Sequence, residues 1–439
     1  MKKIFLLLAA AALTLGSCDK EFTNPSAATE AQVLTSSDGL IAVCNSLAAR
    51  YSTGGALSLL YNTVAAGGLT TREQLVLNVG NIDEFNVSQG AGNVTNSNAV
   101  VRNLWNQAQL IRANADLVLQ NANNAPDAAT RSGIIGFASV FRALALGNLA
   151  QFFEQAPLTT QINAPFVPRL QLLQSAVSQL ETAEAALLAN PPSADFNGKI
   201  VPGVDLLNTV RALIARYSLL AGDYDKALAA AGRVDLTRRS VLNFDEVTRN
   251  AVFEWAYGNR NVIEPTDANL GLPAALAPEA GDRRIPFYVR LTPTSTQNRG
   301  LGFYSASAAP VPLYVPGEML LIRAEAYARK NDLPNAVTEL NRVRTSNAAA
   351  TVNSSNLPTA PPGAGLAAYA GAQTQDAILL DIYRQRQVEL AFQGFRLEDS
   401  RRFGRPGPGI TGAERNRNFL PYPRGERENN SSTPADPAI

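Results

Sequence analysis

The chain has 439 residues, of which 46% are hydrophobic and 17% are charged, with 38 basic residues against 37 acidic ones and no histidine. This balance leaves no basic stripe, which argues against a nucleic-acid partner. The absence of histidine excludes His-based catalytic triads and His metal sites, and no cysteine cluster replaces them. No cofactor and no metal-binding residue are predicted. The hydrophobic content is ample for one large globular unit.

The N-terminus has the order of a secretion signal. Two lysines precede an apolar run at residues 4–13, which is shorter than the ~20 apolar residues of a membrane span. The sequence Leu-Gly-Ser-Cys at residues 15–18 then resembles a bacterial lipobox. We therefore expect a signal peptide at residues 1–17 and a lipidated N-terminus with a polar tether at residues 18–30, in which acyl chains such as palmitate on Cys18 hold the protein on a membrane. The alternative is an ordinary signal with an incidental cysteine.

The next part, residues 31–237, is predicted to be an N-terminal helical repeat region. A first helix is expected to follow Ser37 and Asp38, with Cys44 as a small buried residue, since the lipidated cysteine leaves it no disulfide partner. Between residues 51 and 100 the helical period gives way to Gly, Asn, Thr and Ser, which predicts loops that often carry binding sites. Helical period then resumes, and Trp105 is expected in the core rather than as a platform for a ligand.

The clearest repeat lies at residues 319–344, which predict two short helices joined by a tight turn. Asp332 is expected to cap the second helix, with Pro334 in its first turn. The same pattern recurs at residues 211–234, and a third copy of its second helix ends near Asn190. Repeated helix pairs with small residues at their contacts predict a mainly α fold of tetratricopeptide-type repeats.

A long interval, residues 238–316, lacks helical period and is rich in Pro, Gly, Asn and aromatic residues. It is longer than an ordinary loop, so we expect an irregular subdomain inserted between the repeats. Short strands are predicted near residues 287–291 and 301–304. The rest of the chain, residues 317–439, is expected to form a C-terminal helical repeat and motif-bearing region.

The C-terminal part carries several short motifs in order. Ala-Glu-Ala at residues 324–326 precedes an Ala-rich helix that ends in Asn-x-Val-Arg at Arg344, GDRR lies at residues 281–284, and FLPYPRGE lies at residues 419–426. The last long helix is expected to carry Arg386, Glu389, Leu390, Phe392, Gly394, Arg396, Asp399 and Arg402. Together with the lipobox and the repeats, these motifs resemble those of the SusD/RagB family of outer-membrane nutrient-binding lipoproteins. The chain departs from the family pattern at Gln393 and Ser400.

This resemblance implies a mainly α protein, in which tetratricopeptide-type helix pairs form a scaffold and an irregular region carries the ligand site. It also implies a lipoprotein of the outer membrane, facing outward, that captures an oligosaccharide, or less often a peptide, and delivers it to a TonB-dependent SusC-like barrel. No enzymatic activity is implied. A surface glycan hydrolase and a repeat scaffold that binds only protein partners are the alternatives.

Acidic residues in the last helix bear on the hydrolase alternative. Arg386 and Glu389 are three residues apart, as are Arg396 and Asp399, so each pair shares one side of a helical segment. We interpret these residues as a charge network that ties the last helix to the repeats, with a basic neighbour keeping each acid ionised, rather than as an acid pair for glycan hydrolysis.

Aromatic residues in the irregular segments are the candidate ligand-binding groups. A sugar ring offers an apolar C–H face to an aromatic ring, while its hydroxyls need donors and acceptors nearby. Trp255 and Tyr257 are the first choice, because an extended backbone would send both rings to one side, with Asn259 close behind. The opposing interpretation is that Trp255 closes the core under the inserted region. Further candidates are Tyr61, Phe303 and Tyr304.

Overall fold

The computed structural model describes residues 30–439, so the predicted signal peptide and Cys18 lie outside the described residues. The described chain begins with α2 (Glu30–Leu34) and α3 (Ser37–Ser52). The Ser36 hydroxyl accepts a hydrogen bond from a backbone N–H in the first turn and so caps α3. Cys44 is fully buried on this helix, as predicted.

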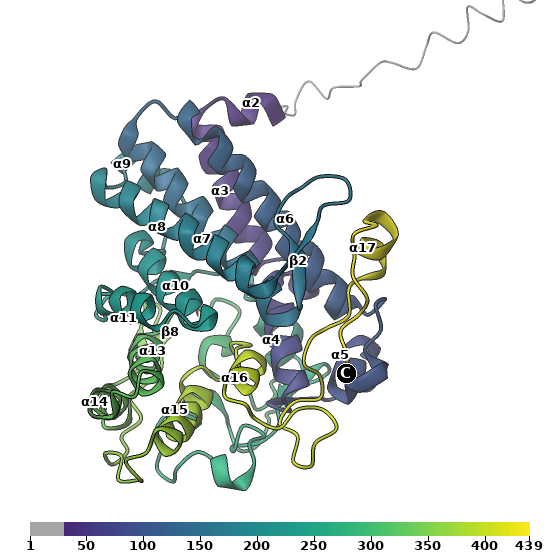
Figure 1. Cartoon of the computed structure of the whole chain (residues 1–439), viewed down its shortest axis with the longest axis vertical. Coiled ribbons are helices and arrows are strands. Elements are labelled where there is room, and N and C mark those ends of the chain that lie inside the picture. Colours follow the sequence, from purple (N-terminus) through teal and green to yellow (C-terminus); the bar gives the residue numbers. More distant parts are fainter. Residues whose placement is uncertain (1–29) are drawn as a thin grey trace, which may run out of the picture.

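Long helices form the scaffold in consecutive pairs (Figure 1). The helices concerned are α6 (Ala99–Asn121), α7 (Ala128–Phe152), α8 (Arg169–Ala189), α10 (Leu206–Ala221), α11 (Tyr224–Gly232), α13 (Pro316–Arg329) and α14 (Leu333–Arg344). Helix α6 packs against α3 and α7, while α7 pairs with α8, α10 with α11, and α13 with α14. Neighbouring pairs also touch, because α8 packs on α10 and α11 on α13. This arrangement confirms the predicted mainly α fold of tetratricopeptide-type repeats.

The repeats recognised in the sequence use the same local devices. Asp332 caps α14 and Asp223 caps α11, each by accepting a hydrogen bond from a backbone N–H in the first turn. Ala324, Ala328 and Ala336 are fully buried where α13 meets α14. Such small side chains let the paired helices approach closely.

Helix α7 is the central helix of the core. Among the residues that the structure describes, it is the one helix apolar and long enough to span a membrane, but 89% of that stretch is buried inside the protein. It contacts α6, α8 and α10. A helix that is hydrophobic all round is expected in such a position.

The prediction that residues 51–100 form loops is wrong, because this segment contains two helices. These are α4 (Leu59–Thr70) and α5 (Ile82–Gln89). Every residue of α4 is buried. A helix without a solvent-facing side needs no polar stripe, so its sequence carries no helical period.

The interval 238–316 is made of short elements and loops. The strands predicted near residues 287–291 and 301–304 are wrong, because these segments form the single helical turns α12 (Ile285–Tyr288) and η6 (Gly302–Tyr304). Their only strand-like link among the described residues is one antiparallel bridge between Val289 and Gly300. Gly302 has a φ of 64°, which starts a turn instead of extending a strand.

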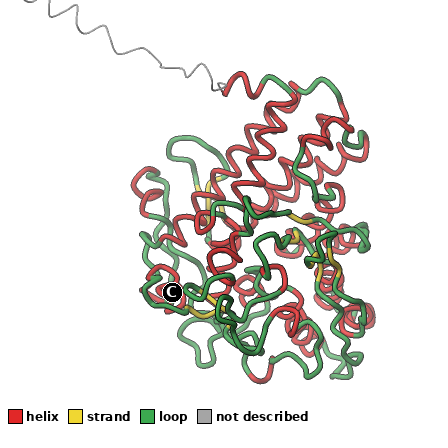
Figure 2. The backbone as a smooth tube through the Cα atoms, turned by 180° about the vertical axis from the view of Figure 1, so that it is seen from behind, coloured by secondary structure: helices red, strands yellow, loops and turns green. Residues whose placement is uncertain are grey.

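Short antiparallel strand pairs tie distant parts of the chain together. Within residues 30–439 the pairs are β1 (Gln74–Val76) with β5 (Ile263–Pro265), β2 (Gln155–Pro157) with β3 (Phe166–Pro168), β4 (Val241–Leu242) with β6 (Val311–Pro312), and β7 (Thr351–Val352) with β8 (Pro358–Ala360). The β1–β5 pair, with Leu75 opposite Glu264, holds the irregular interval beside the end of α4. Figure 2 shows long helices gathered in the upper part of the molecule and loops dominating the lower part.

The C-terminal motif predicted as one long helix is divided in two. It forms α15 (Gln375–Glu389) and α16 (Arg396–Arg402). The chain breaks between them because Phe392 and Gly394 have φ angles of 59° and 82°, which no right-handed helix accommodates. The last helix is α17 (Arg424–Asn429), and a short helix, α9 (Ala194–Lys199), follows α8.

Candidate functional site

Most of the aromatic residues singled out in the sequence lie in the core. The exposed fractions of Tyr61, Tyr257, Phe303 and Tyr304 are 1%, 1%, 1% and 2%. The ring of Tyr257 meets those of Tyr304 and Phe392 edge-on, at centroid distances of 5.5 and 6.0 Å. These four side chains therefore pack the irregular interval onto the helices and do not face a ligand, which corrects the prediction for each of them.

Hydrogen bonds satisfy the buried hydroxyls of this group. The amide of Gln74, on β1, donates to the Tyr257 hydroxyl at 2.7 Å. Tyr61 on α4 donates to a carboxylate oxygen of Glu84 on α5 at 2.9 Å. Burial raises the pKa of both tyrosines well above the ordinary value, so both are neutral at physiological pH.

Trp255 is the exception, because its side chain is 44% exposed. It lies in a π-helical turn, η4 (Phe253–Tyr257), and not in the extended segment that the sequence suggested. In a helical turn, residues two apart point to roughly opposite sides, so Trp255 faces solvent while Tyr257 faces the core. The prediction that both rings share one side is wrong for this reason, and Trp255 does not close the core.

The Trp255 ring rests on the backbone of a glycine from another segment. Gly55, in the turn η1 (Gly55–Leu57) before α4, has a φ of 59°, and a Cβ at this position would lie 1.7 Å from Trp255 Nε1. Only glycine combines this backbone conformation with so close an approach. The ring is thus supported from behind and exposed in front.

Amide side chains occur in the segment that follows this tryptophan. Asn259 donates to the Glu254 carbonyl at 3.0 Å and accepts from the backbone N–H of Asn261 at 3.0 Å. Asn261 in turn accepts at its side-chain oxygen from Asn78 at 2.9 Å, and its carbonyl accepts from Asn81 at 2.6 Å. Each amide keeps further donor or acceptor capacity for a ligand. We name Trp255, Gly55, Asn259 and Asn261 the tryptophan platform.

Sequence reasoning missed Gly55, Asn78 and Asn81. Their contribution depends on contacts between residues 54–81 and 253–261, which lie about two hundred positions apart in the chain. The Gly-Gly dipeptide that ends in Gly55 is the one local signal of an unusual backbone.

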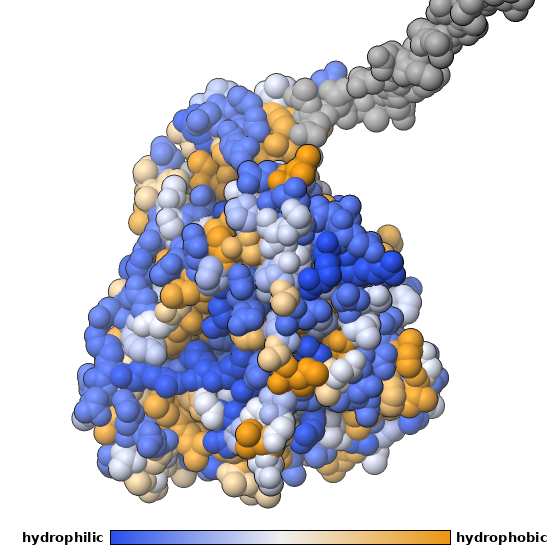
Figure 3. All heavy atoms as spheres, turned by 45° about the vertical axis from the view of Figure 1, so that its right-hand side comes forward, coloured by the Kyte–Doolittle hydropathy of each residue, from blue (hydrophilic) through white to orange (hydrophobic). Residues whose placement is uncertain are grey.

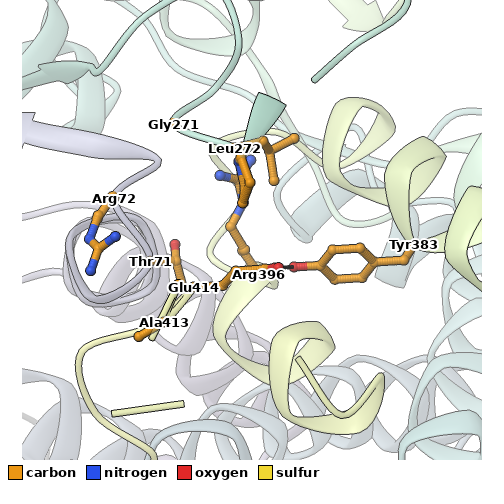
Figure 4. Close-up of a pocket in the computed structure, with 10 residues that line it drawn as sticks. Thr71, Arg72, Gly271, Leu272, Tyr383, Arg396, Ala413 and Glu414 are labelled. Atoms are coloured by element: carbon orange, nitrogen blue, oxygen red, sulfur yellow. Dashed lines mark hydrogen bonds between the residues drawn. The ribbon is translucent and has the colours of Figure 1, made fainter. Parts of the chain in front are cut away.

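A small cavity lies between the end of α4 and the C-terminal loops (Figure 4). Its volume is about 280 Å³, and its lining includes Arg72, Tyr383, Arg396 and Glu414. Tyr383 donates to Glu414 at 2.9 Å, and Arg405 contacts the same carboxylate at 2.6 Å. The Glu414 carboxylate and the Tyr383 hydroxyl are therefore paired within the protein, which makes the cavity a poorer candidate for ligand binding than an exposed site with free polar groups.

Arg396, which lies at the centre of Figure 4, has its own partners from three segments. Its guanidinium donates to Gln387 at 2.9 Å, contacts the Leu270 carbonyl, and lies 3.2 Å from a carboxylate oxygen of Glu73. The sequence predicted an ion pair between Arg396 and Asp399, and this prediction is therefore wrong.

The acidic residues of the motif do form a charge network, but with other partners than the sequence suggested. Arg386 pairs with Asp399 at 2.9 Å, and Glu389 pairs with Arg284 of the GDRR motif at 3.0 Å. The predicted pairing of Arg386 with Glu389 is wrong because α15 ends at Glu389. The chain then turns back, which brings Asp399 to Arg386 and leaves Glu389 to Arg284. Burial raises the pKa of both acids, with the paired arginine acting in the opposite direction. Each acid is thus held by a different arginine, which favours the charge network over an acid pair for hydrolysis.

Comparison with known proteins finds one family match, in the C-terminal part of the chain. The fold defines a helical-repeat protein with a loop-rich insertion, and the model of the SusD family matches residues 252–436. No match was found among curated protein sequences. The matched segment holds the GDRR, α15–α16 and FLPYPRGE motifs. This C-terminal part of the chain is therefore similar to proteins of the SusD/RagB family.

Solved structures agree over nearly the whole chain. A SusD superfamily protein from Bacteroides fragilis is similar with a TM-score of 0.68 and 19% identity, over 91% of this chain and 99% of that one. A SusD superfamily protein from Bacteroides vulgatus has a TM-score of 0.64 and 15% identity, over 93% and 98%. A SusD-like carbohydrate binding protein from Bacteroides vulgatus has a TM-score of 0.60 and 17% identity, over 83% of each chain. At these identities the similarity establishes the shared fold.

Proposed function

We propose that this protein is a cell-surface lipoprotein that captures an oligosaccharide on the tryptophan platform and passes it to a TonB-dependent outer-membrane transporter. The match of residues 252–436 to the SusD family model supports this function, as does the similar fold of a protein described as a SusD-like carbohydrate binding protein. The protein is anchored by a lipid on Cys18, in the outer membrane and facing outward.

The exposed ring of Trp255 is the observation that carries the proposal. Large aromatic side chains are usually buried, and this one is 44% exposed while its neighbour Tyr257 is 1% exposed. The backbone of Gly55 fixes the ring from behind, so little conformational freedom is lost when a ligand binds. Amides at the edge supply the donors and acceptors that sugar hydroxyls need.

A binding screen of the soluble chain from residue 19 onward tests the proposal. The probes are neutral hexasaccharides of glucose, xylose and mannose, a hexasaccharide of galacturonic acid, and a neutral hexapeptide, each measured by calorimetry. Saturable binding of a hexasaccharide supports glycan capture. Binding of the peptide alone would move the proposal to peptide uptake, and release of reducing ends during incubation would favour the hydrolase alternative.

The transporter partner requires a separate test, because its support is the resemblance to the SusD/RagB family. The protein is purified in mild detergent from its native membrane, and the co-purifying proteins are identified by mass spectrometry. We expect a large barrel in about equal amount. A protein that repeatedly purifies without any barrel would contradict the delivery step while leaving glycan capture intact.

A further inference from the structure

A groove of about 620 Å³ lies between α6, the loop that joins β2 to β3, and α17. Its volume is within the ~300–1,000 Å³ range of small-molecule sites and gives room for more than one sugar ring. In Figure 1 the β2–β3 loop and α17 lie beside α6, and Figure 3, which brings this side forward, shows a mostly hydrophilic face with small separate hydrophobic patches. The groove shares no lining residue with the tryptophan platform.

The walls of the groove are held in place by buried polar contacts. Arg112 on α6 is 2% exposed, and its guanidinium donates to the Leu158 carbonyl at 3.0 Å and to the Thr160 hydroxyl at 3.1 Å. From the opposite side, Asn430 donates to the Ala164 carbonyl at 3.0 Å. The β2–β3 loop is thus clamped at both ends by α6 and by the residue that follows α17. A pre-formed groove binds without the cost of ordering its walls.

Polar atoms of the lining remain free to bind a ligand. Within residues 30–439, the side chains of Asn106 and Gln161 form no hydrogen bond, and Gln109 Nε2 is buried without a partner. These amides supply both donors and acceptors.

The charged groups of the groove are already engaged. Arg112 pairs with Asp116 at 2.9 Å, while Glu426 accepts from Trp105 Nε1 at 3.1 Å and from Asn430 at 2.9 Å. The free groups are therefore neutral, which favours a neutral ligand rich in hydroxyls over an ionic one.

Two exposed aliphatic side chains flank these amides. Leu110 on α6 is 44% exposed, and Ile162 at the tip of the β2–β3 loop is 91% exposed. Sugar rings have apolar C–H faces, so contact with these side chains would remove apolar surface from water on both sides. Amides between two aliphatic groups provide the mixture of contacts that a neutral sugar chain needs.

We propose that this groove is a second binding site for a neutral oligosaccharide, separate from the tryptophan platform. The inference rests on the proposed function in its ligand class, since both sites take hydroxyl-rich sugars. A second site lets one chain hold a long glycan at two places, which raises its effective affinity.

The tryptophan content of the chain allows the two sites to be measured separately. The sequence has two tryptophans: Trp255 forms the platform, and Trp105 lines the groove with its indole N–H bonded to Glu426. In a Trp255→Ala variant, Trp105 is the only fluorescent tryptophan and the platform is removed. We expect the neutral hexasaccharide that binds the wild type to change the emission of this variant in a saturable way.

The second part of the test replaces residues that line the groove, each in a protein that already carries Trp255→Ala. Leu110→Ala and Asn106→Ala should each weaken the hexasaccharide affinity of the groove at least fivefold. Leu170→Ala is the matched control, because this leucine is 46% exposed on α8 and does not line the groove. Melting temperatures of all variants should stay near that of the parent, because the replaced side chains are exposed.

Each outcome decides a different question. If the wild type binds a hexasaccharide but Trp255→Ala shows no binding by fluorescence or calorimetry, the second site is wrong and the proposed function stands. If neither protein binds any hexasaccharide, both proposals fail. Binding of the galacturonic acid hexasaccharide or of the hexapeptide in place of neutral sugars, or equal losses in Leu170→Ala and Leu110→Ala, would also overturn the assignment of the groove.

Discussion

Arg386 on α15 and Asp399 on α16 form a two-pronged ion pair, with Nε 2.9 Å from one carboxylate oxygen and Nη2 3.0 Å from the other. Their side chains are 4% and 2% exposed, so water does not screen the pair. Because the chain bends between the two helices, this pair fastens α16 onto α15. The pair gives both residues of the C-terminal motif a structural role.

Removal of one partner should be strongly destabilising. Arg386→Met leaves Asp399 buried with Arg402 as its remaining ion-pair partner, and we expect a loss of ~3–5 kcal/mol in the free energy of unfolding, measured by urea denaturation. Replacing both residues, Arg386→Met with Asp399→Leu, should recover part of this loss because no unpaired charge remains. Arg424→Met, which breaks an exposed pair with Glu428, is the control and should leave the urea midpoint unchanged. Equal effects of Arg386→Met and Arg424→Met would contradict the buried pair.

The two aromatic residues of η4 should respond in opposite ways to truncation. Trp255→Ala should weaken binding of a neutral hexasaccharide by ~1 kcal/mol or more while the melting temperature stays near wild type. Tyr257→Ala should instead cost ~3–5 kcal/mol of stability, because a fully buried ring is lost and Gln74 keeps no partner. Calorimetry and thermal denaturation separate the two effects. A large stability loss in Trp255→Ala would assign this residue to the core after all.

The contact between Gly55 and Trp255 allows the position of the ring to be tested without replacing the tryptophan or the amides. Gly55→Ala places a methyl group where the indole lies, so the ring must move and hexasaccharide affinity should fall at least threefold. Gly54→Ala is a matched control, because Gly54 also has a positive φ, of 91°, but a Cβ there meets nothing within 4 Å. Both variants carry similar backbone strain. If both lower the affinity equally, strain rather than displacement of the ring is responsible.

Alkaline pH should destabilise the protein through its buried tyrosines. Burial raises the pKa of Tyr51 and of Tyr422 to about 12, compared with about 10 in an unfolded chain. A raised folded-state pKa contributes stability that is fully present below pH ~10 and is lost as the pH rises from there towards 12. The melting temperature should therefore fall across this window. Tyrosinate absorbance checks the cause, and titration of all 12 tyrosines near pH 10 in the folded protein would contradict it.

Lipidation of Cys18 is the prediction for the membrane anchor. The Leu-Gly-Ser-Cys sequence after the apolar run motivates it. Mass spectrometry of protein extracted from the native membrane should find an N-terminal Cys18 with two or three acyl chains, and Cys18→Ala should release the protein from the membrane fraction. A water-soluble native form that begins at another residue would show that the cysteine is incidental.

Local patterns in the sequence determined much of the scaffold. The 3.6-residue period and the recurring small residues predicted the helix pairs, and Asp223 and Asp332 cap their helices as the sequence indicates. The burial of Cys44 and of Trp105 also followed from their place on an apolar helical face. These features depend on residues three or four positions apart, so the chain carries them locally.

Contacts between distant segments determined the rest. Helix α4 is buried on every side, so only the surrounding structure reveals it, and Arg386 takes Asp399 instead of Glu389 because the chain turns at Phe392 and Gly394. The direction of the Trp255 ring depends on a π-helical turn and on Gly55 from a remote loop. Which side of a short segment faces water is decided by what packs on the other side, and that information is spread across the whole chain.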